Sequence, residues 1–370
     1  MIFIKSYNHL WEKILSDNNI LLAIKHAAKG KNKNNSRHRL LRHISNHAED
    51  YIDAVRTWII YYKSEPHRET IINDGISAKK RRIMVPTAKE LIVHHALINV
   101  LKPIFLPSMY EHSYGSLPGK GLHKGVKTVK KWVQKNYIQT RYCAKLDIYH
   151  FFESIDTKIL YDIISKRIRD KRLLELIREI LNVQEKGVPL GFITSQWFAH
   201  IVLNRFDHYL KEVLGIKRYI RFVDDMVIFS ISKCHLRGVV RRIEWYLWKF
   251  LRLKLKGNWQ IFPILDHVHT SMNGRPLDFL GYKFYRDRVC LRGKIALKAQ
   301  RKAKHIFKKG RANVKDARQI IVYASITRYA NVYRWFKTHI DKYVDIKKMR
   351  KIVSTYDRSH QRRNNYAQIA

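Results

Sequence analysis

Two adjacent acids, Asp224 and Asp225, interrupt an otherwise apolar segment of this chain. Tyr219, Ile220 and Phe222 precede the acids, and Met226–Phe229 follow them, so β-forming side chains lie on both sides. This pattern predicts a hairpin that carries the two carboxylates at its turn. At such a turn both carboxylates reach one divalent cation from the same side. Taken alone, the Asp-Asp pair is more typical of a solvated turn than of a catalytic site.

A second acid ends a similar short strand earlier in the chain. Cys143–Leu146 lead directly to Asp147. Two strand ends that deliver three carboxylates meet the needs of two-metal phosphoryl chemistry, in which one Mg²⁺ activates the attacking oxygen and the other the leaving oxygen. Carboxylate oxygens are the hard ligands that Mg²⁺ prefers. We therefore expect Asp147, Asp224 and Asp225 to be catalytic residues and metal ligands.

Six segments of the chain resemble, in order, the sequence blocks of reverse transcriptases. The aromatic residue Phe152 lies five positions after Asp147, as in the first catalytic block of that family. Each segment alone is a weak signal, but the ordered set over roughly residues 79 to 285 is specific. The segments are Lys79–Ile83 and Val93–Leu97 (fingers blocks), Asp147–Ile155 (first catalytic block), Gly187–Gln196 (template and nucleotide block), Phe222–Asp225 (aromatic-x-Asp-Asp box) and Leu277–Tyr282 (primer grip).

The resemblance implies an α+β fold of the right-hand polymerase type. In such a fold the fingers, a palm with a small antiparallel sheet, and a helical thumb follow one another along the chain. We expect N-terminal helices and fingers over residues 1–141, the palm over 142–292, and a basic helical thumb and tail over 293–370. The implied activity is RNA-directed DNA synthesis from dNTPs on an RNA template, with an RNA/DNA hybrid as product.

The resemblance also implies roles for residues of the metal and nucleotide sites. Asp147, Asp224 and the backbone carbonyl of Ile148 would hold two Mg²⁺ ions, for which Mn²⁺ can substitute, and Asp225 would contribute on the primer side. Lysine and arginine side chains would neutralise the triphosphate. An aromatic ring against the sugar would exclude a 2′-hydroxyl by steric clash. The nucleotide-binding residues expected are Lys80, Arg82, Phe152, Gly191 and Gln196.

Contacts to the primer and template are expected from Ser195 and from the primer-grip residues Phe279, Leu280, Gly281 and Tyr282. The family often carries a lysine after the primer-side block that is proposed as a general acid. Lys254 and Lys256 are the two candidates for that position in this chain.

The middle block bears on the subfamily. Group II intron enzymes usually show Gln-Gly-x-x-x-Ser-Pro there, whereas this chain has Leu190-Gly191 followed by Ser195-Gln196. That form resembles the reverse transcriptases of diversity-generating retroelements, which work with a small basic accessory protein. Leu91 and Leu117 stand where those enzymes usually carry arginine. A defence-system reverse transcriptase that uses a dedicated non-coding RNA is therefore kept as an alternative, as are a non-catalytic RNA-binding scaffold and a metal-dependent nuclease.

The charge of the chain agrees with a nucleic-acid partner. Lysine and arginine number 73 against 30 acids, which gives a formal net charge of +43 at pH 7. Such a charge favours binding to a polyanion. Hydrophobic residues make up 46% of the chain, too many for a disordered basic tail. The three cysteines form no Cys-x-x-Cys pair and no apolar run reaches about 18 residues, so we expect a cytoplasmic protein without a membrane span.

Periodicity predicts the main helices that surround these motifs. An amphipathic helix is expected over residues 90–101, ended by Pro103, and a single long helix over residues 159–181. A strand is expected at residues 82–85. Beyond Lys294 the chain is expected to be helical and basic, with aromatic residues of which most pack into the thumb's own core.

Overall fold

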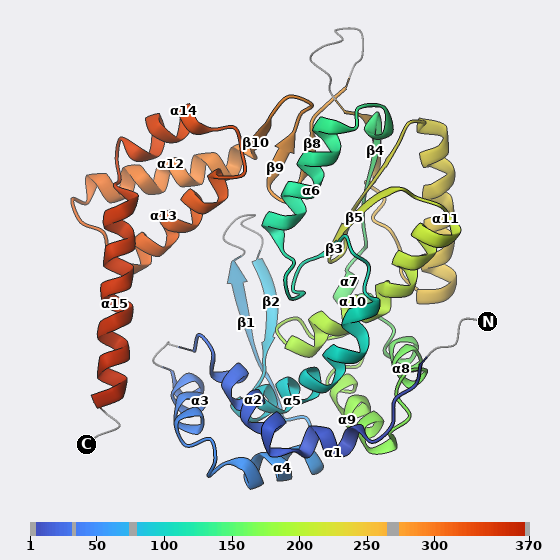
Figure 1. The fold of residues 1–370 in the computed structure, drawn as a ribbon, viewed down its shortest axis with the longest axis vertical. Coiled ribbons are helices and arrows are strands. Elements are labelled where there is room, and N and C mark those ends of the chain that lie inside the picture. The colour runs from blue at the N-terminus through green and yellow to red at the C-terminus, as the bar shows by residue number, and fades with distance from the viewer. Residues whose placement is uncertain (1–4, 32–34, 74–79, 265–273, 367–370) are drawn as a thin grey trace.

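The computed structural model of the chain describes residues 5–31, 35–73, 80–264 and 274–366, with side chains to residue 359. Figure 1 shows the N-terminal helices at one end, a mixed sheet in the middle and a C-terminal helical group to one side. Helices and a small, mainly antiparallel sheet alternate along the chain, so the α+β expectation is confirmed.

Helix α5 (Ala88–Phe105) is the centre of the N-terminal region. Thr87 and Glu90 form a capping box at its start, and apolar residues on nearly every side of the helix are buried. Pro103 does not end the helix as predicted, because it lies in the last turn, where a proline removes a single helical hydrogen bond. The helices around α5 are α1 (Leu10–Leu15), α2 (Asp17–Ala28), α3 (Ser36–Asn46) and α4 (Ile52–Ile60).

Together with the 3₁₀ turn Leu106–Ser108, α5 is long and apolar enough to cross a membrane by length and composition alone. This corrects the expectation that no apolar run reaches that length. Within this fold, 61% of the apolar window is buried, and α5 packs against α2 and α10 (Ile193–His208) as a core helix does.

A two-stranded antiparallel hairpin lies between α4 and α5 in the chain. It pairs β1 (Arg68–Asn73) with β2 (Lys80–Val85), with Arg68 opposite Val85 and Asn73 opposite Lys80. The end of β2 was predicted from the sequence, whereas β1 was not, because its six residues (Arg-Glu-Thr-Ile-Ile-Asn) do not alternate between apolar and polar.

The five-stranded central sheet has the order β3-β5-β6-β4-β7. The parallel pairing of the short strand β3 with β5 is its single departure from an antiparallel arrangement. Helix α6 precedes strand β4 in the chain, and α11 covers one face of the sheet. The bounds are β3 (Ser113–Tyr114), α6 (Leu122–Lys135), β4 (Tyr142–Asp147), β5 (Arg218–Phe222), β6 (Asp225–Ser230), α11 (Lys233–Leu251) and β7 (Gln260–Pro263).

The predicted long helix over 159–181 is wrong, because the chain forms two helices there. Helix α8 (Thr157–Ser165) ends before Asp170, which caps α9 (Lys171–Leu181) through the Leu173 amide. The other oxygen of the Asp170 carboxylate accepts hydrogen bonds from the amides of Leu10 and Trp11. The break between α8 and α9 therefore anchors the N-terminal segment. A short helix, α7 (Phe151–Ser154), precedes α8.

The C-terminal region starts with a three-stranded sheet of β8 (Leu277–Phe279), β9 (Tyr282–Phe284) and β10 (Val289–Leu291). The helices that follow share a separate small core, which includes Ala303, Ile320 and Ile340. In Figure 1 this group lies on the side of the molecule opposite α11. The helices are α12 (Gly293–Lys308), α13 (Val314–Thr327), α14 (Tyr333–Phe336) and α15 (Ile346–Tyr366).

Candidate active site

The register of the central sheet brings Asp147 and Asp225 together. Strand β4 pairs antiparallel with β6 so that Asp147 lies directly opposite Asp225. Side chains alternate between the two faces of a strand, and Leu146 and Met226 belong to the core cluster on the α11 side. The Asp147 and Asp225 carboxylates are consequently on the other face, the one covered further along by β8–β10.

Asp224 lies in the two-residue turn between β5 and β6, as predicted for this hairpin. Its neighbour Val223 has a φ of 59°, which is rare for a β-branched residue. The Val223 amide donates to the Tyr114 carbonyl at 3.2 Å, and Arg221 Nη1 donates to the Val223 carbonyl at 2.8 Å. These bonds hold an unfavourable backbone conformation at the position just before the carboxylates.

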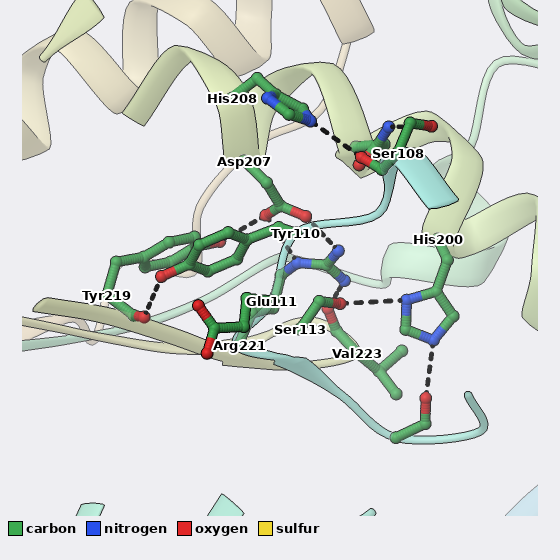
Figure 2. Close-up of polar contacts among 12 residues, drawn as sticks. Ser108, Tyr110, Glu111, Ser113, His200, Asp207, His208, Tyr219, Arg221 and Val223 are labelled. Atoms are coloured by element: carbon green, nitrogen blue, oxygen red, sulfur yellow. Dashed lines mark hydrogen bonds and ion pairs between the residues drawn. The ribbon is translucent and has the colours of Figure 1, made fainter. Parts of the chain in front are cut away.

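A fully buried ion pair between β5 and α10 supports this turn. Arg221 and Asp207 are each 1% exposed in their side chains, and Arg221 Nη2 donates to Asp207 Oδ2 at 2.5 Å. Arg221 Nε donates to Asp207 Oδ1 at 2.9 Å, so the pair is bidentate. Tyr219 also donates to Asp207 Oδ1, at 2.8 Å, and Tyr110 donates to the Tyr219 carbonyl at 2.7 Å. Figure 2 shows how these groups from β5, α10 and the segment before β3 converge.

The residue after β3 also shapes the turn. Gly115 has a φ of +93°, and a Cβ at this position would lie 2.9 Å from Val223 Cγ2. The buried His200 side chain donates from Nε2 to the Gly115 carbonyl at 2.8 Å, and its Nδ1 is 3.3 Å from the Ser113 hydroxyl (Figure 2). Burial lowers the pKa of His200 to about 3, so the imidazole is neutral. Sequence reasoning did not identify His200.

The electrostatics of the three carboxylates fit a site that binds cations. Burial raises the pKa of Asp225 to about 7. Burial, followed by the neighbouring Asp147 charge, raises the pKa of Asp224 to about 6. Asp225 Oδ1 is buried and accepts no hydrogen bond within the described structure. An orphaned buried carboxylate oxygen is costly unless a ligand occupies it.

The Lys256 side chain places a cation against Asp147. Its Nζ contacts Asp147 Oδ2, and its backbone amide donates to the Asp147 carbonyl at 2.8 Å. The backbone amide of Tyr149 donates to the Lys254 carbonyl at 2.8 Å. This bond and the bond from the Lys256 amide lie on either side of Ile148, and neither uses the Ile148 carbonyl. Of the two lysine candidates, the structure therefore brings Lys256 to the carboxylates. Among the residues described, no three His, Cys, Asp or Glu side chains already converge as a metal cage.

The middle block packs closely against the β1–β2 hairpin. The Met84 amide donates to the Leu190 carbonyl at 2.8 Å. Gly191 has a φ of +116°, and a Cβ there would lie 2.1 Å from the Met84 carbonyl oxygen, so no larger residue fits. Lys80 and Arg82 are exposed on β2, and Arg82 Nε lies 3.4 Å from Glu69 Oε2. Lys79 lies outside the described residues.

The other predicted nucleotide and template residues differ in exposure. Phe152 is half-buried and packs edge-on against the buried Phe151, with ring centroids 5.4 Å apart. The Phe152 carbonyl accepts from the Val188 amide at 2.8 Å, which ties the first catalytic block to the middle block. Gln196 is exposed, whereas Ser195 is only 2% exposed and its side chain is turned into the core.

The predicted primer-grip residues form the β8–β9 hairpin. Phe279 and Tyr282 are fully buried, and the Tyr282 hydroxyl donates to the Ile326 carbonyl of α13 at 2.9 Å. Leu280 and Gly281 form the turn, both with positive φ, between α6 and α12. Lys145 Nζ on β4 donates to the Asp278 carbonyl at 2.9 Å. The hairpin is thus joined directly to the strand that carries Asp147.

A buried polar cluster in the N-terminal region positions the start of α10. His67 Nε2 lies 2.8 Å from the Glu90 carboxylate, and both side chains are almost completely buried. His94 lies between the Tyr62 hydroxyl and Thr194, at 3.2 Å from each. Burial lowers the pKa of His94 to about 3, so the imidazole that contacts Tyr62 and Thr194 is neutral. The adjacent His94-His95 pair gave no sequence signal for this cluster.

Comparison with known proteins gives a family match over the same region. The family model "Reverse transcriptase (RNA-dependent DNA polymerase)" matches residues 71–284, which is more than half of the 370 residues. Protein YkfC of Escherichia coli K12 is 24% identical over 226 residues, which cover 57% of this chain and 54% of that protein. This chain therefore spans about half the length of that relative.

Two further relatives match shorter parts. The group II intron-encoded protein LtrA of Lactococcus lactis is 26% identical over 41% of this chain and 26% of its own length. The retron Ec73 reverse transcriptase of Escherichia coli is 30% identical over 26% of this chain and 34% of its own. The solved structure of apo telomerase from Candida tropicalis has a TM-score of 0.43 at 13% identity, covering 67% of this chain and 52% of that one.

The family match spans both catalytic blocks, the middle block and the primer-grip hairpin. Its span includes β4, β5 and β6, which carry the three carboxylates, and the two strands of the β8–β9 hairpin. The expected right-hand polymerase fold is thereby confirmed. The chain belongs to the reverse transcriptase family.

Proposed function

We propose that this chain copies an RNA template into DNA by nucleotidyl transfer at Asp147, Asp224 and Asp225. One observation supports this above all: the β4–β6 register sets Asp147 opposite Asp225 on one face of the sheet, and Asp224 lies in the adjoining β5–β6 turn. The same face continues into the β8–β9 hairpin through Lys145 and Asp278. A primer end held by that hairpin would lie next to the carboxylates.

The donor set fits divalent cations. Asp147, Asp224, Asp225 and the Ile148 carbonyl would supply hard oxygen ligands, and the orphaned Asp225 Oδ1 would gain a partner. Two bound Mg²⁺ ions, or Mn²⁺ in their place, would neutralise charge on the attacking and leaving oxygens. Lys256 marks the Asp147 carboxylate as a cation site in the free chain, and its Nζ would have to leave that carboxylate.

In the reaction, a primer 3′-oxygen forms a bond to the α-phosphorus of a dNTP, and the bond from that phosphorus to the bridging oxygen breaks. The hydroxyl proton passes to solvent and pyrophosphate leaves. Positioning dominates this chemistry. Lys80 and Arg82 would bind the triphosphate, while Gly191 would let the nucleotide pair approach the backbone. The Phe152 ring would exclude a ribose 2′-hydroxyl, and Gln196 would contact the template strand.

The proposed biological setting is a diversity-generating retroelement in the cytoplasm, with a small basic accessory protein as partner. The sequence Leu190-Gly191 with Ser195-Gln196 supports this subfamily. Leu91 and Leu117, where those enzymes usually carry arginine, are both buried in the main core, so apolar packing here takes the place of a charged cluster. A defence-system enzyme with a dedicated non-coding RNA is the runner-up.

The test is to purify the chain with its native RNA and add labelled dNTPs with Mg²⁺. DNA that maps to the co-purified RNA is the expected product, and changes concentrated opposite adenines would support the retroelement setting. Short faithful or repetitive copies of a structured RNA would instead favour the defence setting. RNA that binds without any DNA synthesis would overturn the polymerase proposal in favour of an RNA-binding scaffold.

A further inference from the structure

The outward side of α11 exposes three large aromatic rings. Trp245, Trp248 and Phe250 are 46%, 64% and 48% exposed, although rings of this size are usually largely buried. Exposed cations lie on the same helix, and positions 241, 245 and 248 recur with the helical period on one side. We call this surface the α11 face, and it consists of Arg241, Arg242, Trp245, Trp248, Lys249 and Phe250.

Two of the three exposed rings, Trp245 and Phe250, belong to a connected series of rings. Trp245 and Phe250 meet edge-to-face at 5.4 Å between centroids, and Phe250 lies 4.9 Å from Tyr246. Tyr246 in turn stacks on Tyr209 at 4.4 Å, which extends the aromatic surface to the end of α10. Lys249 Nζ lies 5.3 Å above the Trp245 ring. Connected exposed rings of this kind mark an interaction site more than isolated ones do.

The α11 face lies on the opposite side of the sheet from the carboxylates. Leu236, Ile243 and Leu247 of α11 pack into the same core cluster as Leu146 and Met226, whose side chains point away from the carboxylate face. Figure 1 shows α11 at the margin of the molecule, opposite the α12–α15 group. A nucleotide or primer bound at the carboxylates would not touch this surface.

The charge of α11 selects the kind of partner. Its 19 residues include five lysines and arginines and one acid, Glu244, which accepts a hydrogen bond from Trp259 Nε1 at 3.2 Å. A second copy of this chain, with a net charge of +43, or a basic accessory protein would be repelled here. A single-stranded polynucleotide matches instead, because its bases stack on exposed rings while its phosphates pair with the cations.

We propose that the α11 face binds single-stranded RNA, namely the uncopied part of the template molecule that lies outside the active site. The inference rests on the proposed function, since an enzyme that copies RNA holds one long single-stranded ligand whose copied part alone occupies the carboxylate face. Trp245 and Trp248 stack bases, and Arg241, Arg242 and Lys249 contact phosphates. The surface holds RNA without reading its sequence.

The test compares two ligands of the full chain. One is a short blunt RNA/DNA hybrid, and the other is the same hybrid with an oligo(U) tail of about 20 nucleotides at the template 5′ end. In the unaltered chain we expect the tail to tighten binding, and 4-thiouridine in the tail to crosslink to α11. In the Trp245→Ala/Trp248→Ala variant the increase in affinity that the tail provides should fall by about tenfold or more, while affinity for the blunt hybrid stays unchanged.

Charge variants provide the matched control. Arg241→Glu/Arg242→Glu should lose the gain from the tail, whereas Lys171→Glu/Arg172→Glu, an equal change at two exposed adjacent cations of α9, should keep it. The proposal would be overturned if the tail increased affinity equally in all variants, or if crosslinks formed only on other helices. It would also be overturned if α11 bound an acidic protein while binding of the tail stayed unchanged. Incorporation of dNTPs into DNA is measured separately. A chain that binds the tail through α11 without making DNA would therefore refute the proposed polymerase activity and not the proposed RNA-binding surface.

Discussion

Arg221 donates at once to the Asp207 carboxylate and to the carbonyl of Val223, the residue that precedes Asp224 and Asp225. One guanidinium therefore links α10 to the turn that presents Asp224. Lysine would keep the charge but cannot make these divergent contacts, since it lacks the planar fork. We expect Arg221→Lys to lower the rate of dNTP addition by roughly 10- to 100-fold through displacement of the turn.

The matched control for this variant is Arg218→Lys on the same strand, where the guanidinium bonds to the surface amides of Gln139 and Asn136. It should retain its rate. Affinity for template RNA should be unchanged in both, and steady-state rates with saturating dNTP provide the measurement. A fully active Arg221→Lys protein would show that the turn does not need this support.

Asp225→Ala should abolish DNA synthesis and leave RNA affinity within a few-fold, because the role proposed for this carboxylate is to bind metal ions and not RNA. Asp162→Ala, an equal change at an exposed acid of α8, should retain activity. Primer extension and RNA binding are measured on the same preparations. Full activity of Asp225→Ala would remove the carboxylate cluster from the mechanism.

Removal of Lys256 should make the free chain bind Mn²⁺ more tightly. The ammonium contacts Asp147 and competes with a metal ion for that carboxylate. Because the pair is one-third exposed, the gain should be modest, about two- to fivefold in affinity. Lys254→Ala, two residues away on an exposed side chain, serves as control. Titration of Mn²⁺ by electron paramagnetic resonance tests this, and equal affinity in both variants would contradict it.

The raised carboxylate pKa values predict a pH-dependent stability in the absence of metal. Asp224 and Asp225 have folded pKa values of about 6 and about 7, above the value of about 3.9 of an unfolded aspartate. Between those limits the folded state binds more protons than the unfolded state, so its stability falls as pH rises from about 4 to 7. We expect Asp224→Asn/Asp225→Asn to raise the Tm in EDTA by a few degrees at pH 7.5 and by less at pH 5. Thermal unfolding across that range checks it, and a gain that does not depend on pH would refute it.

Phe152→Ala should relax discrimination against ribonucleotides, because the ring would no longer occupy the space of a 2′-hydroxyl. We expect the ratio of rNTP to dNTP use to rise by about tenfold or more. Phe151→Leu, a change in the buried neighbouring ring, should lower stability without altering that ratio. Single-nucleotide addition with each nucleotide measures the ratio, and an unchanged value in Phe152→Ala would assign that ring to packing alone.

The local parts of the site were predictable from the sequence. Alternating apolar residues around Asp224 and Asp225 predicted their hairpin, and Cys143–Leu146 predicted the strand that ends at Asp147. Both signals depend on residues adjacent in the chain. The ordered blocks supplied the expected fold, which local patterns alone do not fix.

The support of the site was not predictable in the same way. Arg221 and Asp207 are 14 positions apart on different elements, so only the packing of β5 on α10 brings them together. A charged residue between Ile220 and Phe222 in a buried strand was nevertheless a signal for a buried partner. The break at Asp170 also carried a signal, an N-cap residue before Lys171, which helical periodicity on both sides concealed.

The position of β4 between β6 and β7 has a consequence for synthesis of the protein. Its neighbours β6 and β7 both follow it in the chain, and Lys256 comes 109 positions after Asp147. At about 5–20 residues per second, a ribosome needs roughly 5–20 s to add that stretch. During the part of this interval that precedes β6, the newly made Asp147 strand has a partner on neither side. The nascent chain therefore cannot assemble its carboxylate cluster until translation has passed β6.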